Sequence, residues 1–152
     1  MPKSQVAAVS NYDVNFPVGA AAADQVPVLA LRSRFGRGGK ITFRIEPTSG
    51  FGGENEDAES DVEVSIEVSA DGVTFTPTTA ANNGVAVTDE AIPALTHGEF
   101  EINLRQGLDN VVRVQGRGTD RGSRVHIQVR GNSDLDLVFE GQDLSAKGPT
   151  GP

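Results

Sequence analysis

Few side chains in this chain are suited to covalent chemistry. Cysteine is absent, which excludes a thiolate nucleophile, a disulfide and a thiolate metal site. His97 and His126 can titrate near neutral pH, but neither lies in a nucleophile motif or at the H-E-x-x-H spacing of a zinc site. A catalytic triad can assemble from residues distant in sequence, and separated carboxylates can hydrolyse glycosides, but no spacing here indicates either. We therefore expect a protein that is not an enzyme and that uses no cofactor or metal.

An acidic loop is the nearest approach to a cation site. Five carboxylates fall within residues 54–61: Glu54, Glu56, Asp57, Glu59 and Asp61. Calcium needs several oxygen ligands at defined positions, and the spacing of an EF-hand loop is absent. We expect a solvated acidic loop, with calcium binding as the alternative that stays open.

A basic, glycine-rich segment precedes it. Four cations lie within residues 32–40: Arg32, Arg34, Arg37 and Lys40. Glycine-rich basic loops can cradle phosphate, but the G-x-x-x-x-G-K-[ST] motif is absent and no helix is expected to follow. We expect these cations to supply surface charge or to contact a protein partner, rather than to bind a nucleotide.

The charge of the chain is sorted by segment. The 152 residues carry a formal net charge of −8, which argues against a general nucleic-acid binder because such proteins need a basic footprint. Residues 54–101 contain twelve acidic residues and no Lys or Arg, while the segments on either side are mildly basic. A charged partner, if there is one, is therefore expected to be another protein surface.

Alternating apolar and polar residues predict β-strands along most of the chain. Residues 61–70 alternate strictly, and Asp71-Gly72 then predicts a tight hairpin with residues 73–76 as the returning strand, ended by Pro77. Similar alternation recurs in several further segments: 41–45 (ended by Pro47), 100–104, 112–116, 125–129 and 135–139. Residues 26–31 and 85–88 are expected to add two strands with a weaker pattern. Eight or nine short strands without an intervening amphipathic helix predict an all-β, antiparallel sandwich or barrel.

Two of these strands carry opposite charges on their outward faces. Glu63 and Glu67 face outward if the valines of residues 62–68 face inward, and Arg124 and Arg130 face outward if the apolar residues of 125–129 do. One interpretation is pairing within the monomer, which contributes little per pair. The other is association with further copies or with a charged partner. We take these four residues and the cations of residues 32–40 as candidate partner contacts.

A carbohydrate-binding module is an alternative for a β-sandwich, because such modules grip sugar rings with exposed aromatic faces. Tryptophan is absent and Tyr12 is the single tyrosine, which weakens this interpretation. Four phenylalanines fall on apolar strand faces and are expected to pack in the core: Phe43, Phe75, Phe100 and Phe139. Three are expected in loops: Phe16, Phe35 and Phe51.

One folded domain with irregular ends is expected. We predict an extended N-terminal arm over residues 1–24, the sandwich over residues 25–141 and a flexible tail over residues 142–152. The first residues show no secretory signal, and no apolar run approaches the length of a membrane span. No membrane partner is therefore expected.

Four segments between residues 64 and 117 form a recognisable set: VSADGVTFT (68–76), NNGVAV (82–87), IPA (92–94) and EFEINLR (99–105). In these segments, which cover about a third of the chain, the sequence resembles small virion proteins of tailed bacteriophages. These are mainly strand and hairpin motifs, and no binding residues of the family can be aligned with them.

The resemblance implies a capsid decoration (cement) protein. Such proteins are often jelly-roll-like, commonly trimerise, and bind the major capsid protein to strengthen the head, often with an arm that reaches a neighbouring subunit. On this basis we expect a jelly-roll-like homo-oligomer, with a trimer as one form, on the capsid surface after synthesis in the reducing bacterial cytoplasm. A head-fibre or tail-associated module and a carbohydrate- or surface-binding module remain the alternatives.

Overall fold

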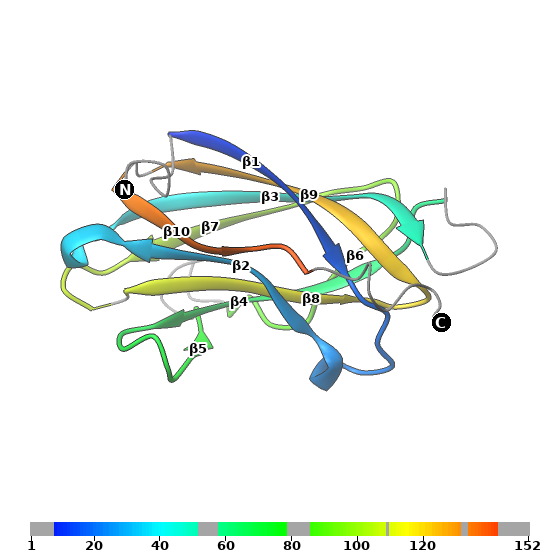
Figure 1. Cartoon of the computed structure of the whole chain (residues 1–152), viewed down its shortest axis with the longest axis horizontal. Coiled ribbons are helices and arrows are strands. Elements are labelled where there is room, and N and C mark those ends of the chain that lie inside the picture. Colours follow the sequence, from blue (N-terminus) through cyan, green and yellow to red (C-terminus); the bar gives the residue numbers. More distant parts are fainter. Residues whose placement is uncertain (1–7, 52–57, 79–85, 109, 132–133, 143–152) are drawn as a thin grey trace.

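The computed structural model describes residues 8–51, 58–78, 86–108, 110–131 and 134–142. These residues form ten strands, which are drawn in Figure 1: β1 Val9–Phe16, β2 Val26–Ser33, β3 Gly39–Phe51, β4 Val62–Ser69, β5 Thr76–Pro77, β6 Glu90–Ile92, β7 Gly98–Leu104, β8 Val111–Gly118, β9 Gly122–Gly131 and β10 Leu135–Glu140. Two short 3-10 helices join them, η2 Ala22–Asp24 and η3 Arg34–Gly36.

The strand order is that of a jelly roll. One sheet has the order β1-β9-β3-β7, and the other has the order β10-β2-β8-β4-β5, with β6 also paired to β4. Strands from the start of the chain pair with strands from its end in a nested order. The pairs are β1 with β9, β2 with β8, β3 with β7, and β4 with β5 and β6, and all are antiparallel. Nested antiparallel pairs that alternate between two sheets define a jelly roll. The expected all-β, jelly-roll-like sandwich is therefore confirmed, with ten strands in place of eight or nine.

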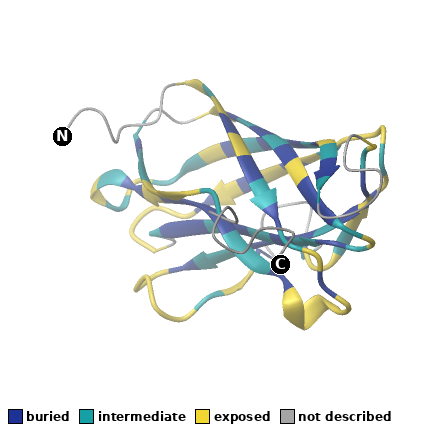
Figure 2. Cartoon of the chain, turned by 45° about the vertical axis from the view of Figure 1, so that its right-hand side comes forward, coloured by how far each residue is buried: buried dark blue, intermediate teal, exposed yellow. Residues whose placement is uncertain are grey.

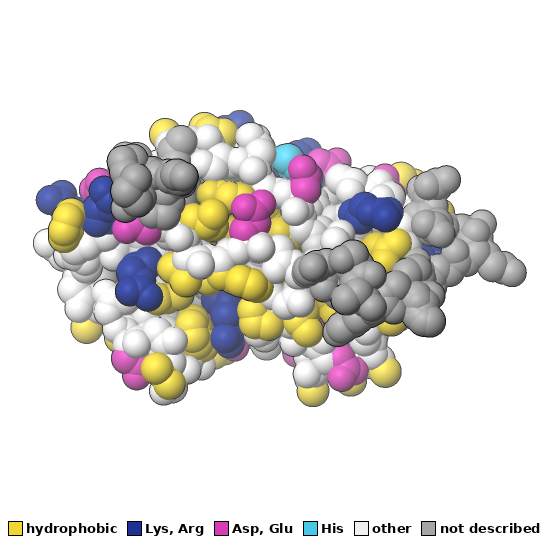
Figure 3. Space-filling view, in the orientation of Figure 1, with side chains coloured by type: hydrophobic (Ala, Val, Ile, Leu, Met, Phe, Trp, Pro, Cys, Tyr) yellow, Lys and Arg dark blue, Asp and Glu magenta, His cyan; other side chains and the backbone are white. Residues whose placement is uncertain are grey.

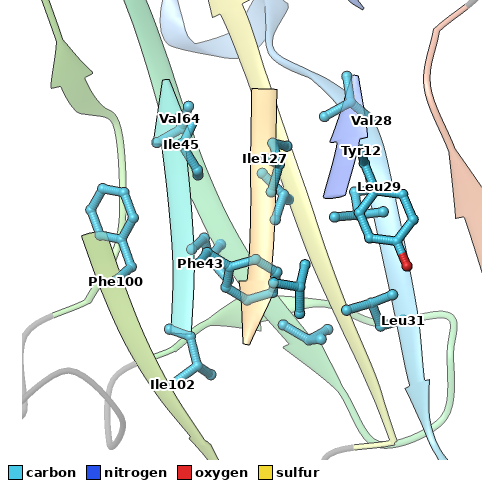
Figure 4. Packing of buried hydrophobic residues seen from close by; sticks show 14 of the residues in the cluster. Tyr12, Val28, Leu29, Leu31, Phe43, Ile45, Val64, Phe100, Ile102 and Ile127 are labelled. Carbon is cyan, nitrogen blue, oxygen red and sulfur yellow. The ribbon is translucent and has the colours of Figure 1, made fainter. Parts of the chain in front are cut away.

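The core lies between the two sheets and follows from the period-two patterning. Phe43 and Ile127 point inward from one sheet, and Leu29 and Leu31 point inward from the other, all fully buried (Figure 4). Burial alternates with exposure along most strands (Figure 2). The hydrophobic contacts between the two inner faces are thus what holds the sheets together.

The segment expected to be an extended arm contains an edge strand of the sandwich. β1 pairs with β9 over eight residue pairs, from Val9 opposite Arg130 to Phe16 opposite Ser123. Tyr12, Val14 and Phe16 alternate with polar residues, and all three side chains are buried in the core. The alternation covers few residues and follows a segment without a regular pattern, so the sequence does not reveal a strand here. Burial of these side chains makes residues 9–16 part of the domain. Residues 1–7 lie outside the described residues, as do residues 143–152 of the expected tail.

Two expected strand ends are wrong. β3 does not end at Pro47 but continues to Phe51, and the register with β9 shifts between Pro47 and Ser49. A bulge can accommodate proline because the missing N–H is not needed there. The hairpin after β4 is also wider than expected, since β5 contains only Thr76 and Pro77 and residues 70–75 form the connection.

Four phenylalanines differ from their expected places, and one of them is Phe51, which ends β3 instead of lying in a loop. Phe16 is fully buried instead of lying in a loop, because it ends the inward row of β1. Phe75 is half-buried on the outer surface with the Arg113 guanidinium 3.8 Å above its ring, and Phe139 is partly exposed. A register shift in β10 between Leu137 and Phe139 turns the latter away from the core. The strand expected over residues 85–88 is also wrong where it is described, because β6 begins only at Glu90.

Candidate partner-binding surfaces

The cations of residues 32–40 lie at one end of the sandwich, in and beside the loop between β2 and β3. Arg34 forms a hydrogen-bonded ion pair with the Asp136 carboxylate of β10, and its backbone N–H donates to the Asp134 carbonyl at 2.7 Å. The side-chain hydrogen bond raises the pKa of Arg34 and lowers the pKa of Asp136. Arg34 therefore holds this loop against β10.

The other three cations keep more of their side chains in water. The Arg37 side chain is 61% exposed and lies 3.8 Å from the Asp134 carboxylate, and the Lys40 side chain is 62% exposed and lies 3.3 Å from Glu101. Arg32 is exposed near the end of β2. Ion pairs this accessible to water contribute little to folding. These cations can consequently exchange their partners for an external one at low cost.

Three loops meet at this end of the molecule (Figure 1). The Gly107 N–H donates to the Gly36 carbonyl at 2.5 Å, the Ser33 N–H donates to the Asn110 carbonyl at 2.6 Å, and the Asn110 N–H donates to the Ser69 carbonyl at 2.9 Å. These bonds join the β2–β3, β4–β5 and β7–β8 connections into one platform. We call the following residues the basic loop end: Arg32, Lys40, and the described loop residues 34–38, 70–75, 105–108 and 110.

A shallow hollow opens on the basic loop end. It is lined by Arg32, Ser33, Asp71, Gly72, Asn110 and Val111. The Asp71 carboxylate accepts the N–H groups of Thr74 and Val73, both at 2.8 Å, and these bonds lower the pKa of Asp71. The carboxylate is therefore held in place by its own loop.

Glu63 and Glu67 face outward from β4, and each meets an arginine of β8. Glu63 Oε1 lies 2.9 Å from Arg117 Nε, and Glu67 Oε1 lies 2.5 Å from Arg113 Nη2, in each case directly across the strand pair. Gln25 also donates to Glu63 at 3.0 Å. Glu63 and Glu67 are thus paired within the chain, which agrees with the interpretation that the outward charges pair inside the monomer. A role for these two acids in binding a partner stays a prediction.

Replacement of Arg117 by Met should destabilise the fold in a pH-dependent way. The Arg117 hydrogen bond holds the pKa of Glu63 below its ordinary value, so the pair stabilises the fold above the unfolded-state pKa and ceases to do so as the pH falls through the folded-state pKa. We expect a loss of about 1 kcal/mol at pH 7 that shrinks at pH 3, measured by urea unfolding.

The matched control for this change is Arg130→Met. The Arg130 Nε donates to the neutral Gln128 side chain at 2.9 Å, so its loss should show no such change between pH 7 and pH 3. An Arg117→Met difference that is the same at both pH values would contradict the assignment, because the remaining Arg117 contact, to the Gly19 carbonyl, does not titrate.

Arg124 and Arg130 lie on the outer face of the other sheet, as expected for β9. Arg124 Nη1 donates to the Gly50 carbonyl at 3.1 Å, and its guanidinium lies 5.3 Å from the centre of the Phe51 ring. A polar hollow on this face is lined by Thr42, Arg44, Glu99, Gln128 and Arg130. β9 and β4 belong to different sheets, so the basic and acidic rows do not face each other.

The two histidines lie on the same side of the sandwich. His126 Nδ1 is 3.0 Å from Asp13 Oδ1, and its Nε2 is 3.0 Å from Asn11 Oδ1, so β1 supplies both contacts. His97 Nε2 is 3.2 Å from Glu99 Oε2. Neither histidine meets a serine in these contacts. The sequence does not predict Asp13 and Asn11 as partners of His126, because it predicts an arm and not a strand over these residues.

In the described part of the acidic loop, residues 58–61, two carboxylates accept hydrogen bonds from backbone N–H groups of the β6–β7 loop. The Glu59 carboxylate accepts the Leu95 N–H at 2.6 Å, and the Asp61 carboxylate accepts the Ala94 N–H at 2.7 Å. Residues 54–57 lie outside the described residues, so calcium binding there stays open. Within the described ranges, no cluster of three or more His, Asp or Glu residues could hold a metal ion.

In those same ranges, no helix has the length and apolar character needed to cross a membrane.

Exposed apolar side chains are the feature that sequence reasoning largely missed. Phe35, Val73 and Leu108 are all exposed, and each lies in a different loop of the basic loop end. Figure 3 shows Lys and Arg side chains beside hydrophobic ones at the end where Figure 1 places the β2–β3 loop. Phe35 was noted only as a loop aromatic for sugars. The available signal was an apolar residue next to a glycine in each loop: Phe35 before Gly36, Val73 after Gly72 and Leu108 after Gly107.

Comparisons with known proteins find only distant structural likenesses. No protein-family model and no curated protein sequence matches the chain. Among solved structures, a chain of an expanded equine rhinitis A virus particle is 10% identical over 84% of this chain and 70% of its own, with a TM-score of 0.44. The Yersinia pseudotuberculosis-derived mitogen is 10% identical over 86% and 95%, with a TM-score of 0.45. A cowpea mosaic virus empty particle is 7% identical over 88% and 85%, with a TM-score of 0.40. The neighbours thus include viral capsid proteins and a mitogen, and likenesses this distant carry no conclusion about activity.

Proposed function

We propose that this chain is a non-enzymatic virion structural protein, and specifically a capsid decoration protein of a tailed bacteriophage. It would bind the major capsid protein on the outside of the head after synthesis in the bacterial cytoplasm. The observation that carries the proposal is a jelly roll whose outward acids on β4 are paired internally, while three exposed apolar side chains, Phe35, Val73 and Leu108, lie on the loops of one end. That distribution suits attachment to another protein.

The physical requirements of a cementing protein support the same proposal. Such a protein needs a rigid body and complementary surfaces, and needs no reaction centre. Arg113 and Arg117 each form an ion pair with an acid of the neighbouring strand, and these pairs help to keep the sandwich rigid. The exposed loop residues are available for contact with a partner. A homo-oligomer on the lattice, including a trimer, belongs to this proposal, because the basic and acidic segments of the sequence could meet between copies.

A second candidate function rests on the polar hollow over β3, β7 and β9. Its lining of Thr42, Arg44, Glu99, Gln128 and Arg130 offers donors and acceptors of the kind that bind sugar hydroxyls. Aromatic side chains are missing from that lining, so a sugar ring would find no stacking surface there. A glycan-binding or tail-associated module therefore ranks second.

The test is to look for the chain on particles and then to rebuild the complex. Mass spectrometry of purified virions from the phage that encodes the chain should find it in fixed ratio to the major capsid protein. Purified protein should co-sediment with expanded heads that lack it and should raise their disruption temperature. Its mass in solution should be measured by light scattering alongside. Absence from virions together with selective binding on a glycan array would sink the proposal in favour of the second candidate.

A further inference from the structure

Phe35 is placed in a way that the fold itself does not require. It is 86% exposed at the tip of the β2–β3 loop, with φ at 59° and ψ at 26°. This left-handed conformation is unfavourable for any side chain with a Cβ, and bulky residues rarely adopt it. Burial of the ring does not compensate, since the ring lies in water. A strained and exposed aromatic residue of this kind is a reason to look for an external ligand.

The surroundings hold Phe35 in one position. Gly36 also has a positive φ, of 66°, and its carbonyl accepts the Gly107 N–H, which fixes the β2–β3 loop to the β7–β8 loop. Arg34, on the other side of Phe35, is tied to β10 through Asp136. The ring is therefore presented on a backbone that is already ordered. An ordered anchor loses little conformational entropy when it enters a pocket.

Two more apolar side chains and several cations surround this anchor. Leu108 and Val73 are exposed on the two neighbouring loops, and Gly107 joins the Leu108 loop directly to the Phe35 loop. Residues 32–40 contain four cations, of which Arg37 and Lys40 keep most of their side chains in water although each faces a carboxylate. An aromatic anchor with arginines around it is the composition of an interface hot spot.

We infer that the basic loop end is a docking surface in which Phe35 enters an apolar pocket of an acidic protein surface. The cations around Phe35 argue for negative charge at the rim of that pocket. The fixed backbone of Phe35 argues for a partner with a shaped pocket, because a fluid lipid surface has none. This inference rests on the proposed function and deepens it, because it assigns the face of the decoration protein that meets the capsid protein.

The test compares two substitutions to asparagine at opposite ends of the sandwich. Phe35→Asn removes the ring and places a residue that tolerates the left-handed conformation, so the fold should be kept. Leu95→Asn is the matched control, since Leu95 is 83% exposed with φ at 69° in the β6–β7 loop. Binding to expanded phage heads is measured by co-sedimentation with purified chain. We expect Phe35→Asn to weaken binding about 30-fold, as for a hot-spot residue, and Leu95→Asn to change it less than about twofold.

A charge variant tests the acidic rim separately. Arg37→Glu should weaken binding to the heads at 50 mM NaCl, and the difference from the unmodified protein should shrink at 300 mM NaCl. The far-ultraviolet circular dichroism spectrum and melting temperature of each variant show that it is folded.

The outcomes separate this inference from the proposed function. If the unmodified chain does not bind heads, both fail. If it binds and Phe35→Asn binds equally well, the docking surface is wrong while the proposed function stands. Binding to vesicles of 30% phosphatidylserine in phosphatidylcholine that is lost in Phe35→Asn would assign the surface to membranes and overturn the inference. A self-association in solution that is lost in Phe35→Asn would assign it to a second copy and also overturn it.

Discussion

Removal of residues 1–24 should unfold this protein, although the sequence predicts an extended arm there. The deletion removes all of β1 and so uncovers the core along the side of β9. Tyr12, Val14 and Phe16 are buried, and burial of each such side chain contributes about 1.5–3 kcal/mol. The summed loss is similar to the total stability of a domain, about 5–15 kcal/mol. Near-ultraviolet circular dichroism and thermal melting of the truncated protein measure the effect.

A shorter deletion and a point substitution serve as controls. Removal of residues 1–7 retains β1 and the Gly131 N–H bond to the Ala8 carbonyl, so it should leave the cooperative melt almost unchanged. Phe16→Ala should cost about 3–5 kcal/mol in urea unfolding, because Phe16 is fully buried and its ring lies against Gly116. A truncated chain without residues 1–24 that melted like the full chain would show that β1 is not part of the folded domain.

Gly131→Ala should also destabilise the sandwich strongly. Gly131 ends β9 with φ at 134°, where a residue with a Cβ is strained, and an added Cβ would lie 2.2 Å from the Lys40 carbonyl oxygen. The strained backbone costs about 1–3 kcal/mol, and moving the β3 backbone away costs about 1–3 kcal/mol more. The measurement is the free energy of unfolding in urea.

Gly107→Ala separates these two contributions. Gly107 has φ at 79°, but no atom lies within 4 Å of an added Cβ. Only the backbone strain remains, so we expect a loss of about 1–2 kcal/mol. Equal losses in the two variants would mean that the close approach of Gly131 to β3 does not matter for stability.

The positions of most strands could be predicted from local pattern alone. The alternation of valines and polar residues over residues 62–69 identifies β4 and the side of it that faces the core, because a strand turns successive side chains to opposite faces. The same reasoning locates β7, β8 and β9 and fails at Pro47, where a bulge lets the strand continue. It also fails for β1, whose few alternating residues are too short a signal to be separated from an irregular arm.

The candidate contacts depended on the tertiary structure in a different way. The sequence predicted that Glu63 and Glu67 face outward, but not that Arg117 and Arg113 lie beside them, because β8 is distant from β4 along the chain. Pairing between strands of a sheet is set by which strands become neighbours, and that order is decided by the packing of the whole core.

The sequence by itself determined the class of the fold and the kind of surface it can present. Its period-two pattern requires strands with one buried face, and its sorted charges and missing cysteine exclude broad classes of site. Only the tertiary structure decided that three distant loops meet at one end, where Phe35 projects among cations. The physical reason is that a loop position depends on the strands it connects, and the strand order arises from burial of the core as a whole rather than from any local segment.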